Sequence, residues 1–159
     1  MFAQPLIDAL EFARNGKQLR GEVPISALSR LGDLLTDSRG MLHYAVHGYR
    51  VGEVDMLGIE ISGECHLRCQ RCLGELNYPL TLNANLRLVS SAEMDEVEAE
   101  DEVEYLEASS QLDVLALVED ELLLSLPFSP KHATGVCVPA PESLQHSANP
   151  FSVLAALKK

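Results

Sequence analysis

The chain has 159 residues, of which 47% are hydrophobic and 23% charged, and its formal net charge is −12 at pH 7. This length fits one domain with a core of ordinary size, and the apolar content is too high for an intrinsically disordered protein. Tryptophan is absent and only 5% of the residues are aromatic, which argues against a platform that stacks single-stranded bases.

The charge is divided unevenly along the chain. Residues 1–87 contain nine Lys and Arg against ten Asp and Glu, whereas residues 88–159 contain three against fourteen. A surface that binds phosphate needs clustered cations, so the second part is a poor surface for RNA and a plausible one for a basic protein. We expect no DNA partner. An acidic half that only keeps the protein in solution is the alternative.

No stretch approaches the roughly 20 apolar residues that span a membrane, and the N-terminus lacks the basic and apolar regions of a signal peptide. We therefore expect a cytoplasmic protein without a membrane partner. In that reducing compartment the four cysteines are not expected to form structural disulfides.

The first expected elements are short. Residues 7–14 predict a helix that ends at Asn15 and Gly16, and residues 17–23 predict a strand. Pro24 is expected to start a second helix, with Ser26 as a candidate cap. Its leucines recur at helical spacing, at Leu28, Leu31, Leu34 and Leu35.

Three segments then alternate between apolar and polar residues, which is the pattern of strands with one buried face. They cover residues 42–46, 54–67 and 79–89, and the last two flank a loop with the sequence Cys-x-x-Cys. The alternation predicts a single α+β domain over residues 1–127, with an antiparallel sheet or small barrel and a CxxC hairpin tip.

An acidic segment separates these strands from the strongest helix signal. Residues 90–107 hold nine acidic residues and are expected to form a loop, with residues 103–106 as a candidate edge strand. Asp113 is a typical N-cap and Pro127 a stop, so one long helix is predicted between them. This helix is apolar almost all round and must pack on the sheet or on a partner. Residues 128–159 are expected to form a C-terminal extension.

The thiols of Cys69 and Cys72 have the spacing of half a tetrahedral zinc site. The other half is expected at His132 and Cys137, in the extension. Cys65 is a rival ligand, but along an extended strand it lies about 13 Å from Cys69, too far for one zinc ion. Two unliganded thiols are the alternative, and a redox pair is weaker because no clear helix begins at the first cysteine.

Basic side chains lie near the same cysteines. Arg68 and Arg71 bracket Cys69 and, together with Arg50 and Arg87, are candidates for a patch that contacts phosphate. Scattered surface arginines are the alternative interpretation.

Three consecutive carboxylates, Glu119, Asp120 and Glu121, interrupt the apolar helix. They fan over a broad sector, because consecutive helical residues differ by about 100°. Glu121 is expected on a solvated face, whereas Glu119 and Asp120 are expected either there or against an arginine of the protein or of a partner. A nuclease site using this pair is a further alternative, but no third carboxylate at a strand end, reactive lysine or glycine-rich loop accompanies it.

The end of the chain holds more apolar side chains than an unconstrained tail needs: Phe151, Val153, Leu154 and Leu157. They are expected to form a short amphipathic segment. It either docks on the protein's own sheet or inserts, through Phe151 and Leu154, into the groove of a partner.

The CxxC loop, the stretch at residues 112–127, the segment Pro130-x-His132-x4-Cys137 and the tail at residues 149–159 resemble the YceD family of bacterial proteins, over roughly residues 58–159. The resemblance implies a ribosome-biogenesis factor that supports synthesis, processing or stability of 23S rRNA. Its partner would be a large-subunit precursor, contacted through rRNA or a basic ribosomal protein. Since no catalytic set is recognisable, we expect a non-enzymatic role. A metal-dependent RNA-processing enzyme and an acidic chaperone-like module are the alternatives.

Overall fold

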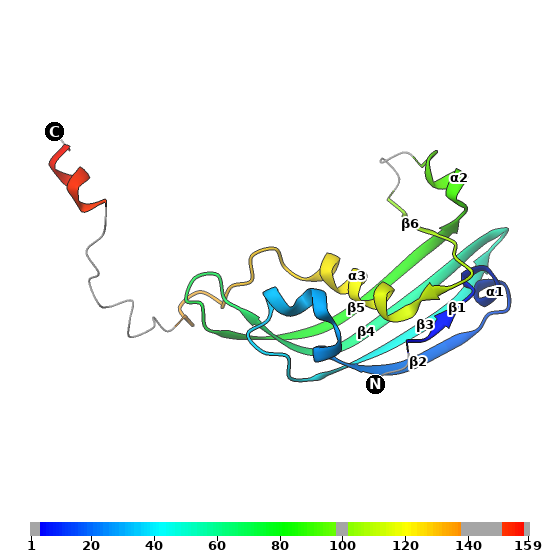
Figure 1. Ribbon diagram of the computed structural model, residues 1–159, viewed down its shortest axis with the longest axis horizontal. Helices are drawn as coiled ribbons and strands as arrows, with labels where there is room; N and C mark the ends of the chain where they lie inside the picture. Colours follow the sequence, from blue (N-terminus) through cyan, green and yellow to red (C-terminus); the bar gives the residue numbers. More distant parts are fainter. Residues whose placement is uncertain (1–3, 98–101, 138–150, 158–159) are drawn as a thin grey trace.

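The computed structural model describes residues 4–97, 102–137 and 151–157 of the chain (Figure 1). Its main element is a five-stranded sheet with the order β2-β3-β4-β5-β6. The strands are β2 (Gln18–Pro24), β3 (Met41–Val51), β4 (Val54–Arg68), β5 (Glu75–Val89) and β6 (Glu104–Glu107). Strands β2 to β5 pair antiparallel, whereas β6 runs parallel to β5.

The sheet is open, so the small barrel offered as an alternative is wrong. In the described part of the chain β2 and β6 form opposite edges of the sheet and do not pair with each other. Closure needs a stagger of the strands and a complete circle of pairing, whereas β6 contributes only four residues at one end of β5. The α+β class is confirmed.

The predicted alternation along β4 is present in the structure. Its apolar side chains Leu57, Ile59 and Ile61 are at most 1% exposed, while Glu60 and Ser62 between them are exposed. One face of the sheet is therefore covered and the other is wet.

A layer of helices covers the apolar face (Figure 1). It includes α1 (Ala9–Arg14), the 3-10 helices η1 (Ile25–Ala27) and η2 (Ser29–Leu34), and α3 (Val114–Ser125). The continuous helix predicted from Pro24 is wrong, because η1 and η2 meet at Leu28 in a non-helical conformation. The spacing of three between Leu28 and Leu31 also fits the three residues per turn of a 3-10 helix.

Helix α3 spans 12 residues and begins where the sequence predicts. The Asp113 carboxylate accepts hydrogen bonds from the N–H groups of Leu115 and Ala116, at 2.9 and 3.1 Å. The helix ends at Ser125, before Pro127. Its N-terminus is tied to the start of the chain by β1 (Leu6–Ile7), which pairs with β7 (Leu112–Asp113).

The described parts of the acidic segment, where a loop was expected, contain a short helix and a strand. After β5 comes the short helix α2 (Ser91–Met94), which begins with a capping box formed by Ser90 and Glu93. Strand β6 then takes the edge position expected near residues 103–106. The 3-10 helix η4 (Ser152–Leu157) lies near the C-terminus. None of the described helices has both the length and the apolar character to cross a membrane.

A candidate metal centre at the hairpin tip

The hairpin of β4 and β5 ends in a tight loop that carries Cys69 and Cys72. The N–H of Cys69 donates to the carbonyl of Gly74, and the N–H of Leu73 donates to the carbonyl of Cys69, both at 2.9 Å. Leu73 has a φ of 60°, in the left-handed region that few non-glycine residues occupy. This conformation helps to close the loop that carries both thiols.

After α3 the chain returns to this loop. The N–H of Gln70 donates to the carbonyl of Pro130 at 2.8 Å. The guanidinium of Arg71 donates to the carbonyl of His132 at 2.6 Å. The two bonds fix the backbone on both sides of Lys131, and they bring the His132 imidazole next to the loop.

The four side chains predicted as metal ligands lie together. The sulfurs of Cys69 and Cys137 are 3.7 Å apart, and His132 Nδ1 lies 3.4 Å from Cys72 Sγ and 3.6 Å from Cys137 Sγ. One ligand atom from each of the four residues lies within 4.8 Å of the others. Ligands about 2.3 Å (S) and 2.0–2.1 Å (N) from a tetrahedral zinc are about 3.5–3.8 Å apart. This group could therefore hold a metal ion.

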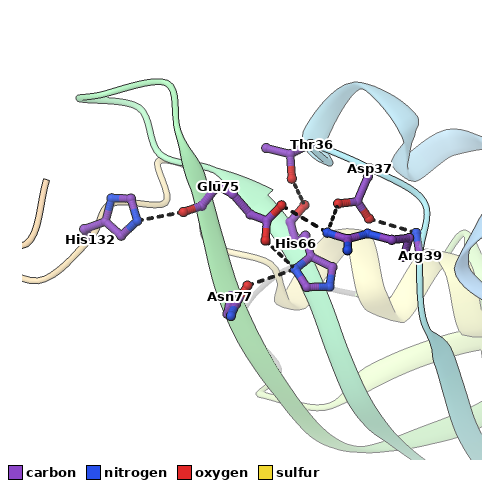
Figure 2. A network of polar contacts seen from close by, with 7 residues as sticks. All are labelled: Thr36, Asp37, Arg39, His66, Glu75, Asn77 and His132. Atoms are coloured by element: carbon purple, nitrogen blue, oxygen red, sulfur yellow. Dashed lines mark hydrogen bonds and ion pairs between the residues drawn. The ribbon is translucent and has the colours of Figure 1, made fainter. Parts of the chain in front are cut away.

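The orientation of His132 also suits a ligand. Its Nε2 lies 2.8 Å from the carbonyl oxygen of Glu75, toward which the ring points in Figure 2. Because a carbonyl only accepts, Nε2 carries the proton and Nδ1 presents its lone pair to the thiols. A hydrogen bond of this kind from the second ring nitrogen is typical of histidines that bind metal ions.

The thiols of the group differ in acidity. Burial by itself raises the pKa of the Cys69 thiol, but nearby donors lower it to about 5: the N–H groups of Cys72, His132 and Arg71 and the thiol of Cys137. Burial and the neighbouring thiols of Cys69 and Cys72 raise the pKa of Cys137. Like charges this close disfavour one another, so the three sulfurs can all be thiolates only with a cation between them. A divalent metal ion satisfies that condition.

Cys65 lies outside this group. It is 4% exposed and sits opposite Tyr78 within the sheet, and burial raises the pKa of its thiol to about 11. Its position fits a core side chain of the covered face.

A network of polar contacts braces the loop from the other side (Figure 2). The Glu75 carboxylate contacts Arg39 at 3.2 Å and His66 Nδ1 at 3.3 Å, and Arg39 also pairs with Asp37 at 2.7 Å. Asp37, His66 and Glu75 are close enough to hold a second metal ion, but Arg39 already supplies their cation and lowers the pKa of Asp37 to about 2. The network joins the hairpin tip to the segment before β3.

Sequence reasoning missed His66 because its partners depend on strand register. His66 faces Asn77 across the hairpin, and its Nδ1 lies 2.9 Å from the Asn77 side-chain oxygen. The spacing between the two residues does not by itself identify them as a pair. The length of the Cys loop was the usable signal, because it sets which residues of β4 and β5 face each other.

The four-arginine patch does not exist. Arg87 lies opposite Met56 and Arg68 opposite Glu75, so the two ends of the hairpin are about 40 Å apart at ~3.3 Å per residue. Arg50 pairs with Asp55 at 2.8 Å, and Arg87 lies over the ring of Tyr105. Of the four arginines, Arg68 and Arg71 remain near the cysteine loop.

The carboxylates of α3 fall into two environments. Arg30 of η2 pairs with Glu119 at 3.1 Å and with Asp120 at 2.7 Å, and its N–H also donates to Glu119. Glu121 is 6% exposed, so its expected place on a solvated face is wrong. It follows Val114, Leu117 and Val118 by seven, four and three positions on α3, and a helix places such residues on one face. All three are buried.

The tail residues Phe151 and Leu154 are 69% and 52% exposed. Docking on the protein's own sheet would cover these side chains, so their exposure does not support that alternative. Insertion into a partner stays a prediction.

Comparison of the sequence with known proteins finds a matching family. A family model described as large ribosomal RNA subunit accumulation protein YceD matches residues 57–158. A curated protein of Haemophilus influenzae with that description is 29% identical over 170 residues, covering 96% of this chain and 94% of that protein. No solved structure matches. The matched range contains all four residues of the candidate metal centre.

Proposed function

Because the chain belongs to the YceD family, we propose that it is a non-enzymatic ribosome-biogenesis factor supporting synthesis, processing or stability of 23S rRNA. The observation that carries this proposal is the family match over residues 57–158, which includes the hairpin tip, α3 and the tail. We also propose a cytoplasmic location, because ribosomal precursors of bacteria are assembled there.

A structural zinc ion is part of this proposal. Cys69, Cys72, His132 and Cys137 supply three sulfurs and one nitrogen within 4.8 Å of one another, and zinc prefers such ligands. Catalytic zinc sites keep a position open for water or substrate, whereas four protein ligands fill the coordination sphere. The four-ligand set therefore favours a role in holding residues 130–137 against the hairpin tip.

The environment of the helix carboxylates also supports a non-enzymatic role. A metal-dependent RNA-processing enzyme would need Glu119 and Asp120 free to bind a catalytic cation. Both side chains pair with Arg30, which fixes η2 against α3. Their arrangement suits a structural contact between two elements.

A basic protein is a better direct partner than rRNA. Arg50 and Arg87 are engaged elsewhere, which leaves Arg68 and Arg71 as a thin surface for phosphate. Residues 88–159, in contrast, carry fourteen carboxylates against three cationic side chains. We propose that the protein contacts the large-subunit precursor through a basic protein component.

The test is complementation in a bacterium from which the corresponding gene has been deleted. The wild-type chain is expected to restore the ratio of 23S to 16S rRNA, and Cys69→Ser is expected to fail because the zinc site is lost. Cys65→Ala is the matched control, since this thiol lies outside the metal centre, and it should complement. A deletion strain with an unchanged 23S to 16S ratio would contradict the proposed function.

A further inference from the structure

A cavity of about 480 Å³ lies between α3, β5 and the segment that leads into β6. Its carboxylates come from Glu102 and Glu104 on one side and Glu121 on the other. Apolar side chains, among them Met56 and Leu124, form part of the walls, and Asn83, Asn85 and Ser125 add polar groups. This volume is in the range that accommodates a ligand or a large side chain.

Glu121 is an unusual member of this wall. It is 6% exposed, and no hydrogen bond or ion pair reaches its carboxylate from the residues that the structure describes. Burial raises its pKa, and so do the nearby charges of Glu104 and Asp120. A carboxylate in a largely buried site without a cation is costly, so a cation that entered the cavity would stabilise the charged form of Glu121.

The other buried carboxylates of the described chain do have cations. Asp55 is 7% exposed and pairs with Arg14 and Arg50, and Glu119 is 9% exposed and pairs with Arg30. Glu121 is the exception in this set of three. The missing arginine or lysine would have to come from outside the described part of the chain.

The walls of the cavity suit the whole length of such a side chain. Leu124 is 77% exposed and Val103 is 45% exposed, although both are large and apolar. Lysine and arginine pack their carbon stems along apolar surface while the charged end reaches a polar partner. Here the stem would contact Leu124 and Val103, and the charge would meet the carboxylates.

We propose that this cavity receives a lysine or arginine side chain of a basic protein, with Glu121 as the buried counter-charge and Glu102 and Glu104 at the rim. The inference rests on the proposed function in one respect, since it gives the chemistry and the position of the contact with a basic component.

The backbone beside the cavity suits an extended partner segment. Strand β6 pairs with β5 only from Leu86 to Val89. Residues 82–85 of β5, which line the cavity, have no strand on that edge in the described ranges. An open edge of this kind accepts an added strand. The occupant is therefore an extended basic segment that pairs with β5 and places one cationic side chain against Glu121.

The experiment uses the purified full chain and a short fluorescent peptide that alternates arginine and threonine. Binding is measured by anisotropy at pH 7 and physiological salt. Glu121→Gln is expected to weaken binding about tenfold or more, because the buried counter-charge is lost. Glu22→Gln, which removes an equal charge from the exposed surface of β2 at the opposite edge, is expected to change it less than about twofold. The same peptide with citrulline in place of arginine should bind poorly.

A second measurement follows the Glu121 carboxyl carbon by NMR during a pH titration. The arginine peptide is expected to shift the midpoint to lower pH, because a cation favours the charged carboxylate. If Glu121→Gln and Glu22→Gln lose peptide affinity equally, the peptide is attracted diffusely to the acidic surface, and the proposed pocket is wrong. A Glu121 titration midpoint that the peptide does not move would also contradict the proposal. Neither measurement involves rRNA. A negative result would therefore reject the cavity proposal without rejecting the role in 23S rRNA accumulation, which the complementation experiment tests separately.

Discussion

Cys69 combines complete burial with a pKa lowered to about 5. A buried thiol in apolar surroundings has the opposite tendency, as Cys65 shows with a pKa of about 11. The difference comes from backbone N–H groups that point at the Cys69 sulfur and stabilise its thiolate. A thiolate held in place before the metal arrives is a ready ligand.

The first prediction concerns the metal. The purified protein is expected to contain about one equivalent of zinc, measured by mass spectrometry of the metal. Cys69→Ser should lose that zinc and lower Tm by about 10 °C or more, because structural zinc contributes folding energy. Cys65→Ala, the matched control, should keep the full equivalent. A wild-type protein that is fully folded yet free of metal would contradict the zinc proposal.

The sequence allowed the surroundings of some side chains to be predicted and not those of others. The metal ligands were predicted from their residue types and their spacing along the chain, because few kinds of side chain bind zinc. The burial of Glu121 was missed, although its helical register with Val114, Leu117 and Val118 was available. Charge suggested a solvated face, and the packing of α3 overrode that preference. The arginine patch failed because it required the register of β4 and β5.

Helix α3 contacts both the sheet and η2. Its buried side chains include Leu117, Val118 and Leu122, and they pack in the same core as the sheet. Arg30 joins η2 to the same helix through Glu119 and Asp120. The helix thus receives apolar contacts from the sheet and ionic contacts from η2.

A matched pair of leucines tests this packing. Leu122 is 1% exposed and Leu124 is 77% exposed, and both lie on α3. Leu122→Asp is expected to unfold or aggregate the protein, since an unpaired buried charge costs about 3–5 kcal/mol. Leu124→Asp should melt within about 2 °C of wild type, because surface changes stay near ±0.5 kcal/mol. The measurement is thermal unfolding of both variants followed by circular dichroism. Similar melting curves would contradict the burial of Leu122 and the exposure of Leu124 on α3.

The elements themselves were predictable to different degrees. Alternating apolar residues located β3, β4 and β5, and the Asp113 cap located the start of α3, because these signals are local. The 3-10 helices and the parallel pairing of β6 were not predicted. A spacing of three fits both helix types, and the direction of an edge strand depends on how the chain crosses the sheet.

Cationic and acidic side chains are unevenly placed over the molecule. Arg68 and Arg71 lie at the tip of the β4–β5 hairpin, while Glu102, Glu104 and Glu121 gather on a second surface at β6 and α3. A partner with clustered cations is attracted to the second surface, and phosphate is repelled by it.

Capture of partners from cells tests this asymmetry. The tagged protein is expected to retain a basic ribosomal protein after RNase treatment, because the contact is with protein. Purified protein should bind naked 23S fragments only in the non-specific range, weaker than about 10⁻⁵ M at physiological salt. Tight binding to those fragments that is lost in the double variant Arg68→Glu with Arg71→Glu would identify rRNA as the direct partner.

The separation of the metal ligands along the chain also has a consequence in time. Cys72 and His132 are 60 residues apart, and β5, β6 and α3 are synthesised between them. At about 5–20 residues per second, the first two thiols leave the ribosome some 3–12 seconds before the other two ligands. With the proposed zinc, the coordination sphere can close only after translation has passed residue 137. Metal loading would then mark a nascent chain in which β5, β6 and α3 have already been synthesised.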